Sequence, residues 1–429
     1  MHGDPIPCRR PGRERDCTCP GKQTSRRRSL SMKQWDGPRP ARRSEFAEAM
    51  RFTDLVFRPG QKGRRIVQRQ YPHAYRDDTA HVRRLLILRH LGDLVGCVAI
   101  HPMTLKLGVA RLSAGGIGIV GTHPERRGEG IMSRLLDEAV RRMRRSGKSV
   151  SVLGGDRQRY GRWGWENGGV RVVYELTERS VGRPSAGERA LRLQRLSQDP
   201  DVGLCRRIQR LSAGRSYGVV RPLEDMVPLL VRNGKESWFC EAGRRFAYAV
   251  AGGAQRVNRP YASIHEFGGD PELVLALFRR LLPRSAHGRL SVIAGPNADE
   301  QSLLGPVSAS WTRLADGMTQ ILDVERVVRQ LLPELRSRAA TAGLNGRFIL
   351  QVAGVDGTSQ QATLQLGKTR ASGRPQRLCL DQRELVELLF GCLPIEERFG
   401  AHGGISDTVR RRLATILPLP LHIPSLDHI

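Results

Sequence analysis

Aromatic residues and long hydrophobic runs are both scarce in this sequence. Phe, Trp and Tyr together make up 5% of its 429 residues. No apolar stretch approaches the roughly 20 residues that span a bilayer, and the N-terminus lacks the apolar segment of a secretory signal. We therefore expect a cytoplasmic protein with no membrane span. The hydrophobic content of 39% is still enough for packed cores, and the length favours several domains.

Cysteine spacing indicates neither a disulfide framework nor a metal site. The eight cysteines are dispersed, and we expect reduced, mostly buried thiols. The cluster near the N-terminus fits no zinc pattern, even with His2 included, so we expect no bound metal. The cysteines are Cys8, Cys17, Cys19, Cys97, Cys205, Cys240, Cys379 and Cys392.

Acidic residues are too few to balance the basic ones. The chain has 71 Lys and Arg against 42 Asp and Glu, a formal net charge of +29. Such an excess can indicate a nucleic-acid or anionic-membrane partner. The arginines are scattered along the chain, however, and no zinc-finger spacing or aromatic and basic sheet motif accompanies them. The sequence therefore disfavours a nucleic-acid partner.

Residues 1–57 are predicted to form a basic, disordered N-terminal tail. The stretch RRPGRERDCTCPGKQTSRRRS is rich in Arg, Pro, Gly and Ser. Such a composition does not bury enough apolar surface to become ordered.

The next region, 58–180, reads as an antiparallel meander followed by a helix and a further strand. Strands are expected at 85–89, 94–100, 108–112 and 116–121. Apolar residues then recur at helical spacing from Ile131 to Met143, with Gly147 as the candidate C-cap. KSVSVLGGD is expected to be the last strand.

A predicted linker, 178–190, leads into two further regions. Residues 181–317 repeat the mixed pattern of strands and helices, as in SWFCEA, RFAYAVAG and DPELVLALFRRLLP. Residues 318–429 open with a strand that leads into a helix, MTQILDVERVVRQLL. The whole sequence therefore predicts an α+β protein of several domains.

Two glycines stand where the helix at Ile131 begins. Gly128 and Gly130 lack side chains, so an anion could approach the backbone amides there. The helix N-terminus and the neighbouring Arg126 and Arg127 add positive charge. This turn is a candidate pyrophosphate site, although an ordinary turn between a strand and a helix also favours glycine.

A second glycine pattern has a different meaning. Gly116, Gly118 and Gly121 spell G-x-G-x-x-G, but they lie inside an expected strand, and Pro124 follows. A dinucleotide fingerprint requires a helix that opens within the motif. We therefore exclude a nicotinamide cofactor.

The stretch IGIVGTHPERRGEGIMSRLLDEAV resembles the signature of the GNAT superfamily of N-acetyltransferases. That signature is a strand, then Q/R-x-x-G-x-G/A, then a helix; here Glu125 stands where the family usually has Gln or Arg. The resemblance implies acetyl-CoA as co-substrate. The residues implied to hold it are Val120, Gly121 and Thr122 for the pantetheine arm, Arg127, Gly128, Glu129, Gly130, Ile131, Met132 and Ser133 for the pyrophosphate, and Gly155 and Asp156 beyond them.

DRQRYGRWGWE, residues 156–166, resembles a segment of the Eis-type acetyltransferases. This resemblance implies two tandem GNAT-like mixed-sheet domains followed by a small sterol-carrier-like α/β domain. Residues 58–180 would be the catalytic domain, 181–317 a degenerate second GNAT-like domain, and 318–429 the sterol-carrier-like domain.

The same resemblance implies two catalytic groups. Tyr160 would be the general acid, and the carboxylate of Ile429 would be the base for the acceptor amine. By residue type alone, a half-buried core tyrosine is the more frequent role for a residue such as Tyr160, and fraying is the usual fate of a chain terminus. His428 is a rival base, and His101 and His123 are weaker candidates. Trp163 and Trp165 are expected to pack rather than to bind.

The expected function is acetyl transfer from acetyl-CoA to a primary amine, by direct attack in a ternary complex. The acceptor would be a small molecule or a protein lysine, and the protein could form a homo-oligomer. Eis-type enzymes hold cationic acceptors in an acidic pocket, and no comparable acidic cluster is evident in this sequence. The alternative is a catalytically inactive relative that acts as a lipid- or nucleic-acid-binding module.

Overall fold

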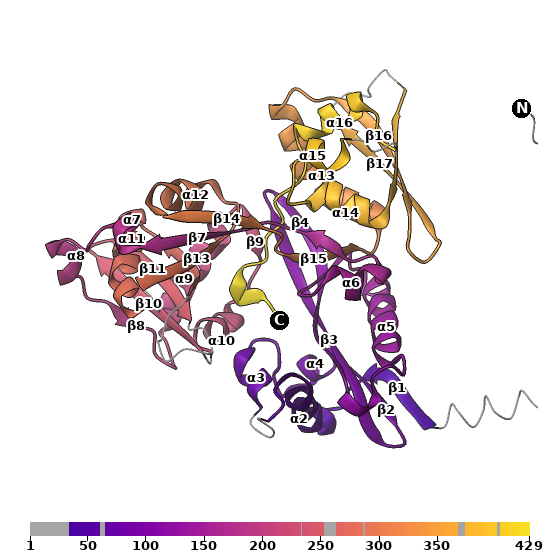
Figure 1. Cartoon of the computed structure of the whole chain (residues 1–429), viewed down its shortest axis with the longest axis horizontal. Coiled ribbons are helices and arrows are strands. Elements are labelled where there is room, and N and C mark those ends of the chain that lie inside the picture. The colour runs from indigo at the N-terminus through magenta and orange to yellow at the C-terminus, as the bar shows by residue number, and fades with distance from the viewer. Residues whose placement is uncertain are drawn as a thin grey trace, which may run out of the picture.

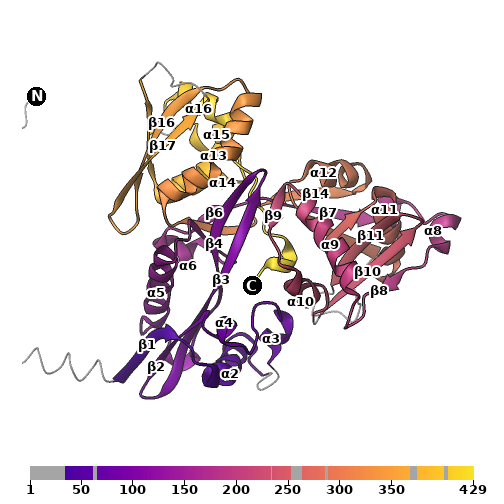
Figure 2. The same cartoon turned by 180° about the vertical axis from the view of Figure 1, so that it is seen from behind.

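The computed structural model describes residues 34–60, 65–232, 234–252, 263–285, 288–367, 374–400 and 404–429. Three β-sheets, each with its own helices, form three lobes (Figure 1). Seen from either side, the C-terminus lies in the middle, where the three lobes meet (Figures 1 and 2). The predicted α+β class is confirmed.

The first lobe is built on a mixed eight-stranded sheet. Its strands run in the order β1-β2-β3-β4-β5-β15-β6, with β9 paired to β3. The two extended stretches expected at 108–112 and 116–121 belong to one strand, β4. The turn that separates it from β3 comes earlier, at Gly108, which has a positive φ of 57°. The bounds are β1 Trp35–Pro40, β2 Leu85–His90, β3 Asp93–Leu107, β4 Ala110–Thr122, β5 Val150–Leu153, β6 Glu166–Gly168, β9 Tyr217–Val219 and β15 Gly317–Ile321.

Helix α5, Ile131–Arg145, packs on this sheet as its sequence spacing predicts. Ile131, Leu135, Ala139 and Met143 are all buried against the strands. Gly147 follows the helix with a positive φ of 71°, the conformation of a glycine C-cap. The other helices of this lobe are α2 Phe46–Phe57, α3 Ile66–Gln70, α4 Thr79–Val82 and α6 Arg157–Tyr160.

The second lobe contains a seven-stranded sheet in the order β14-β7-β13-β12-β11-β10-β8. Its strands are β7 Arg171–Thr177, β8 Gln194–Arg195, β10 Lys235–Ala242, β11 Arg245–Gly252, β12 Ser263–Gly269, β13 Arg289–Ala294 and β14 Ser310–Leu314. Its helices are α7 Glu178–Val181, α8 Ala186–Ala190, α9 Val202–Gly214, α10 Met226–Leu230, α11 Pro271–Leu281 and α12 Ala298–Leu304.

The third lobe has a small sheet in the order β17-β16-β18. One hydrophobic cluster joins its core to β3, β4 and β5 of the first lobe, through residues such as Leu105, Leu112 and Phe348. Its strands are β16 Gly346–Ala353, β17 Ser359–Leu366 and β18 Gln376–Asp381, and its helices are α13 Val324–Thr341, α14 Gln382–Phe390, α15 Ile395–Phe399 and α16 Asp407–Ala414.

The lobes exchange strands, so the boundaries differ from those expected at 180 and 317. Strand β7 lies in the second sheet although it precedes residue 180, while β15 returns to the first sheet and pairs with β5 and β6. The expected linker at 178–190 contains α7 and α8, because the side chains of Thr177 and Ser185 cap their N-termini. These pairings join distant parts of the chain and leave no mark in the local pattern.

The expectation of a disordered tail up to residue 57 is wrong for residues 34–57. Strand β1 pairs with β2, and α2 buries Phe46, Met50 and Phe52 in a core that includes residues of β2 and β3. The buried residues Phe46, Ala49, Met50 and Thr53 have helical spacing, and the basic composition of the preceding stretch hid it. Residues 1–33, including the three N-terminal cysteines and His2, lie outside the described residues.

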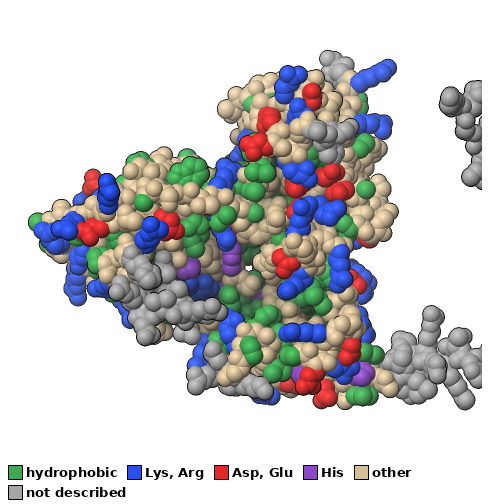
Figure 3. Space-filling model, in the orientation of Figure 1, with side chains coloured by type: hydrophobic (Ala, Val, Ile, Leu, Met, Phe, Trp, Pro, Cys, Tyr) green, Lys and Arg blue, Asp and Glu red, His purple; other side chains and the backbone are tan. Residues whose placement is uncertain are grey.

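Basic side chains on the face shown in Figure 3 are scattered over all three lobes rather than gathered in one stripe. Among the described residues, no three Cys, His, Asp or Glu side chains are grouped so that they could hold a metal ion. In the same part of the chain, each helix is too short or too polar to cross a bilayer.

A buried ion cluster ties the end of the chain to the second lobe. The guanidinium of Arg221 donates to the carboxylates of Glu266 on β12 and Asp427, with nearest distances of 2.6 Å to each. The side chains of Arg221 and Glu266 are each 2% exposed, and the hydroxyl of Tyr248 also donates to Glu266. Burial by itself would raise the pKa of Glu266, but Arg221 and Arg215 lower it to about 2.

The low pKa of Glu266 predicts a loss of stability in acid. A carboxylate with a lowered pKa stabilises the fold above its unfolded value of about 4.3, and this contribution is lost as the pH falls toward 2. We expect the Glu266→Gln variant to be less stable than the native chain by on the order of 3 kcal/mol at pH 7. That difference should shrink steadily between pH 5 and pH 2.5, measured by urea unfolding.

Glu325→Gln is the matched control, because the side chain of Glu325 is 77% exposed. Its carboxylate lies as far as 3.9 Å from the guanidinium of its partner Arg329, so the pair is weak. This substitution should change the stability little at any pH. A Glu266→Gln effect that stays constant or grows on acidification would contradict the assignment.

Candidate active site

Strands β4 and β5 run in parallel and then separate. Their register pairs Gly116 with Val152 and Ile117 with Leu153, and within the described residues no strand continues this pairing beyond Ile117. The rest of β4, up to Thr122, therefore has backbone groups that β5 does not use. Such an opening beside a sheet is a place where a ligand can hydrogen-bond to the main chain.

A β-bulge lies in β4 at this point. Ala99 pairs with Gly118 and Cys97 pairs with Gly121, so Val98 alone faces both Ile119 and Val120. Ile119 has a positive φ of 43°, a rare conformation for a β-branched residue. Bulges and strained residues of this kind are common beside functional sites, because they redirect backbone groups.

A cavity of about 590 Å³ lies beside the bulged strand and the glycine turn. Gly130 is the N-cap residue of α5, and no side chain caps the helix there. Gly128 and Gly130 have φ values of 85° and 73°, and a Cβ at either would meet no atom within 4 Å. The turn therefore presents open backbone with the unpaired N–H groups of a helix N-terminus.

The charge of this cavity is entirely positive. Arg127, Arg159 and Arg162 line it, and none of the other described residues in the lining is charged. The guanidinium of Arg162 donates to the hydroxyl of Ser133 at 2.8 Å and stacks over the ring of Trp163. A basic cavity on a helix N-terminus is complementary to a phosphorylated ligand.

Most, but not all, of the residues predicted to hold the co-substrate line this cavity. The lining includes Val120, Thr122, Arg127, Gly128, Gly130, Ile131, Met132 and Ser133. Gly121 instead faces Phe52 and Phe57, and Glu129 pairs with Arg126 on the surface. The carboxylate of Asp156 caps α6, and Gly155 lies against the ring of Tyr160, where a Cβ would collide with it.

Tyr160 also lines the basic cavity, although it is only 6% exposed. Its ring packs edge-on against Trp165, with centroids 6.3 Å apart. Burial raises the pKa of its hydroxyl, so Tyr160 is protonated at neutral pH and can donate a hydrogen bond. Trp165 is fully buried, and Trp163 donates to Asp137 of α5 at 2.8 Å, so both tryptophans pack as expected.

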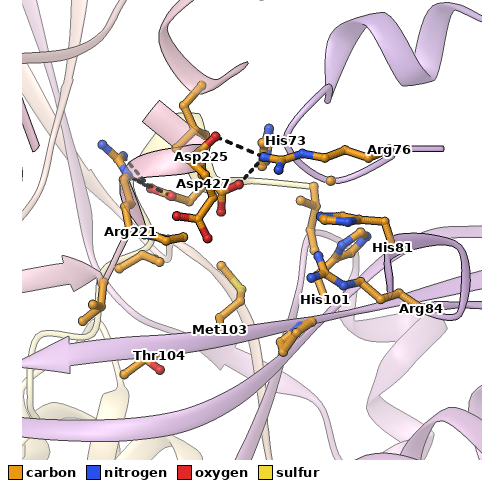
Figure 4. A pocket seen from close by; sticks show the side chains of 18 of the residues that line it. His73, Arg76, His81, Arg84, His101, Met103, Thr104, Arg221, Asp225 and Asp427 are labelled. Atoms are coloured by element: carbon orange, nitrogen blue, oxygen red, sulfur yellow. Dashed lines mark hydrogen bonds and ion pairs between the residues drawn. The ribbon is translucent and has the colours of Figure 1, made fainter. Parts of the chain in front are cut away.

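A second cavity, of about 340 Å³, contains the end of the chain (Figure 4). It is lined from the first lobe by His73, His101 and Met103, among others, and from the second lobe by residues including Arg221 and Asp225. Asp427 and Ile429 also line it. The two cavities have no lining residue in common, but both adjoin β4.

The glycines of β4 make room for Ile429. A Cβ on Gly116 would stand 2.7 Å from Cδ1 of Ile429, and one on Gly118 would stand 3.6 Å from its carboxyl carbon. A Cβ on Gly118 would also stand 2.7 Å from the Tyr75 hydroxyl and 3.6 Å from His101 Nε2. The terminal carboxyl therefore shares a small space with a phenol and an imidazole. The G-x-G-x-x-G pattern has a steric role here: two of its glycines admit the chain terminus.

These neighbours of the terminus are uncharged. Burial raises the pKa of the Tyr75 hydroxyl, while burial together with the charges of Arg84 and His81 lowers the pKa of His101 to about 3. Burial and the charge of Arg232 also lower the pKa of His73. The Tyr75 hydroxyl and His101 Nε2 are buried without a protein partner among the described residues. Such groups are available to a bound ligand or to water.

The last residues are held by contacts from several elements. The carbonyl of Leu421 accepts from Val170 N–H at 2.7 Å, and Ile423 N–H donates to Asp316 at 2.6 Å. Arg232 donates to the carbonyl of Leu426 at 3.1 Å, and Arg221 holds Asp427. Leu426 is itself fully buried in a core of the second lobe. The terminus is therefore fixed in place rather than frayed.

The other histidines predicted as candidates lie differently. His428 is not part of the cavity lining, and its Nε2 bonds the carbonyl of Ile423 at 2.9 Å, which requires that nitrogen to carry a proton. His123 accepts from Glu125 N–H and lies beside Phe52, and it lines neither of these two cavities. Tyr75 and Arg221 were not anticipated, because nothing local in YPHAYRDD or VVRPLED distinguishes them from packing residues.

Comparisons with known proteins agree with this geometry. Residues 38–168 match the family model described as an acetyltransferase (GNAT) domain. No curated protein matches the chain closely enough in sequence to count as a relative. Among solved structures, the GCN5-related N-acetyltransferase of Anabaena variabilis ATCC 29413 superposes with a TM-score of 0.67 at 16% identity, over 92% of this chain and 100% of that one.

Two other solved structures are similar over the same extent. The GCN5-related N-acetyltransferase of Kribbella flavida gives a TM-score of 0.66 at 17% identity, over 92% of this chain and 98% of that one. Eis1 from Mycobacterium abscessus gives 0.61 at 15% identity, over 92% and 100%. Residues 38–168 therefore match the acetyltransferase (GNAT) domain model, within a chain whose fold is similar to that of Eis1.

Proposed function

We propose that this protein is an N-acetyltransferase that uses acetyl-CoA and transfers the acetyl group to a primary amine by direct attack in a ternary complex. One observation carries the proposal. The half-buried Ile429 places its terminal carboxyl beside Gly118 of β4, and Val120 and Thr122 of the same strand line the basic cavity. The proposed base therefore lies beside Gly118, and the proposed acyl-donor site begins at Val120 of the same strand.

The basic cavity fits acetyl-CoA in charge and in shape. The uncapped N-terminus of α5 suits a pyrophosphate, and the three arginines of the lining provide charge for the phosphates. The free edge of β4 suits the amide-bearing pantetheine arm. When bound there, acetyl-CoA supplies an activated acetyl thioester.

The chain itself supplies the proton transfers. The carboxylate of Ile429 accepts a proton from the acceptor ammonium or amine, and the hydroxyl of Tyr160 donates one toward the departing sulfur. Backbone N–H groups freed by the bulge at Ile119 are suited to stabilise the negative charge that develops on the carbonyl oxygen. His101, with its pKa lowered to about 3, is neutral and is a weaker base than an ordinary imidazole.

The acceptor is a small-molecule amine or a protein lysine, the site of action is the cytoplasm, and a homo-oligomer is compatible with the family. The third lobe is proposed to be sterol-carrier-like and to carry the terminus toward the site. An open glycine turn, a buried Tyr160 and an anchored terminus argue against an inactive lipid- or nucleic-acid-binding module.

The glycine turn predicts the first test. Gly130→Val places a branched side chain in the cavity and forces it into a left-handed conformation. Acetyl-CoA should bind at least about tenfold more weakly by calorimetry. Gly343→Val is the control, since Gly343 has a similar φ of 65° and open space around it but lies after α13. Unchanged affinity in folded Gly130→Val would place the co-substrate elsewhere.

Tyr160→Phe removes one hydroxyl and almost no volume. If that hydroxyl is the proton donor, the turnover number should fall about a hundredfold while the affinity for acetyl-CoA stays within about twofold. Tyr174→Phe, in a buried position on β7 of the second sheet, is the control and should keep full turnover. A near-normal rate for Tyr160→Phe would reduce Tyr160 to a packing residue.

The position of the terminal carboxylate can be changed by shortening or lengthening the chain end while Asp427 is retained. A variant that lacks Ile429, and another with two residues added after it, should each lose about a hundredfold or more in turnover. Acetyl-CoA binding should persist in both, because Ile429 does not line the basic cavity. His428→Ala, which keeps the terminal carboxylate, should lose only a few-fold. Full turnover in the extended variant would remove this carboxylate from the mechanism.

A further inference from the structure

The charges that line the cavity of the chain terminus decide which acceptors it can bind. Four side chains are basic and three are acidic, and the carboxylate of Ile429 adds a fourth negative charge. The cavity is therefore not the acidic pocket that a polycationic acceptor needs. Its charged side chains are Arg76, Arg84, Lys148 and Arg221 against Glu224, Asp225 and Asp427.

Most of these charges are already paired within the protein. Arg76 pairs with Asp225, as Figure 4 shows. Arg221 is shared between Asp427 and the nearby Glu266. Glu224 is exposed, and it contributes its backbone carbonyl to Arg76. Two cations, those of Arg84 and Lys148, are left without a carboxylate partner among the described residues.

Arg84 lies close to the reacting end of this cavity. It precedes β2, and its guanidinium extends toward His101 in Figure 4. Its positive charge is one of the causes that lower the pKa of His101. His101 in turn lies beside Gly118 and the carboxyl carbon of Ile429. Arg84 is thus one side chain away from the proposed base.

Arg84 and Lys148 are partly shielded from solvent. Both side chains are half-buried, and burial lowers the pKa of each. The pKa of an arginine remains far above neutral, so Arg84 keeps its charge in this site. The charges of Asp225 and Asp78 act on it, but among the described residues no carboxylate forms an ion pair with it. A half-buried guanidinium with no carboxylate partner is well suited to bind a carboxylate or a phosphate in a bidentate manner.

Three imidazoles also line this cavity: His81, which pairs with Asp78 outside the cavity lining, and His73 and His101, which do not change this balance. His73 and His101 are held neutral, and Nδ1 and Nε2 of His73 and Nε2 of His101 lack a protein partner among the described residues. They can form hydrogen bonds to a polar ligand without adding charge. The volume of about 340 Å³ suits a small molecule.

We propose, on the basis of the function proposed above, that the acceptor is a small amine that also carries a carboxylate or phosphate group. Arg84 and Lys148 bind the anionic group, and the amine lies against the carboxylate of Ile429. A diamine or a polyamine would bring a second positive charge toward Arg84, which disfavours such acceptors. The cavity therefore selects for an amine and an anion together.

Matched acceptors of equal chain length provide the test. We would compare 4-aminobutanoate, 1-aminobutane and 1,4-diaminobutane, with 3-aminopropyl phosphate to separate phosphate from carboxylate. The native chain should give a kcat/KM at least about tenfold higher for one of the anionic amines than for the diamine. Arg84→Met should remove most of that preference and leave acetyl-CoA affinity unchanged.

The control is Arg83→Met, because Arg83 is the exposed neighbour of Arg84 and lines neither cavity. It should keep the preference of the native chain. Lys148→Met should reduce the preference in the same direction as Arg84→Met. A native chain that acetylates the diamine as well as the anionic amines, or an Arg84→Met variant with native preference, would overturn the proposal.

A binding measurement separates this inference from the proposed function. Calorimetry of the same amines on the full chain with coenzyme A present reports acceptor recognition without turnover. Tighter binding of an anionic amine, lost in Arg84→Met, would support the inference even if no amine were acetylated, and only the proposed function would then fail. Equal binding of all four amines would overturn the inference whatever the turnover.

Discussion

The buried contact between Arg221 and Asp427 is the interaction on which the rest of the candidate site depends. It places a residue two positions before the terminus inside the second lobe, where the partner carboxylate of Glu266 and the hydroxyl of Tyr248 complete the cluster. A buried ion cluster is not by itself a strong source of stability, because desolvation opposes the attraction between its charges. Its value here is positional: an arginine that is 2% exposed has little freedom, so Ile429 is held at one place on β4.

Strand β4 connects this terminus to the basic cavity. Its small residues admit Ile429, its bulge redirects the backbone at Ile119, and its last residues line the basic cavity. Each feature would be a defect in an ordinary strand, since glycine weakens a strand and a bulge interrupts the ladder. Together they bring a carboxylate, an open backbone edge and a helix N-terminus to one short segment.

The two cavities differ in their electrostatics. The first has arginines and no acid, as a phosphorylated co-substrate requires. The second cavity has equal numbers of basic side chains and carboxylates. Ion pairs among them leave Arg84 and Lys148 without a carboxylate partner among the described residues, and the terminal carboxylate lies among the neutral rings of Tyr75 and His101. The net charge of +29 predicts neither property, because the charges that matter are those left unpaired at a given site. These unpaired charges determine which kind of acceptor the second cavity would bind.

The sequence by itself determined the α+β class, helix α5 with its glycine C-cap, and the open turn at Gly128 and Gly130, because these depend on residues close together in the chain. Most of the residues that the family resemblance implies for the co-substrate line the basic cavity. Tertiary structure alone decided that β7 and β15 change lobes, and that Tyr75, His101 and Ile429 meet beside Gly118. The physical reason is separation: Arg221 and Asp427 are 206 residues apart, and no periodicity or spacing records a pairing between side chains that only the folded chain brings together.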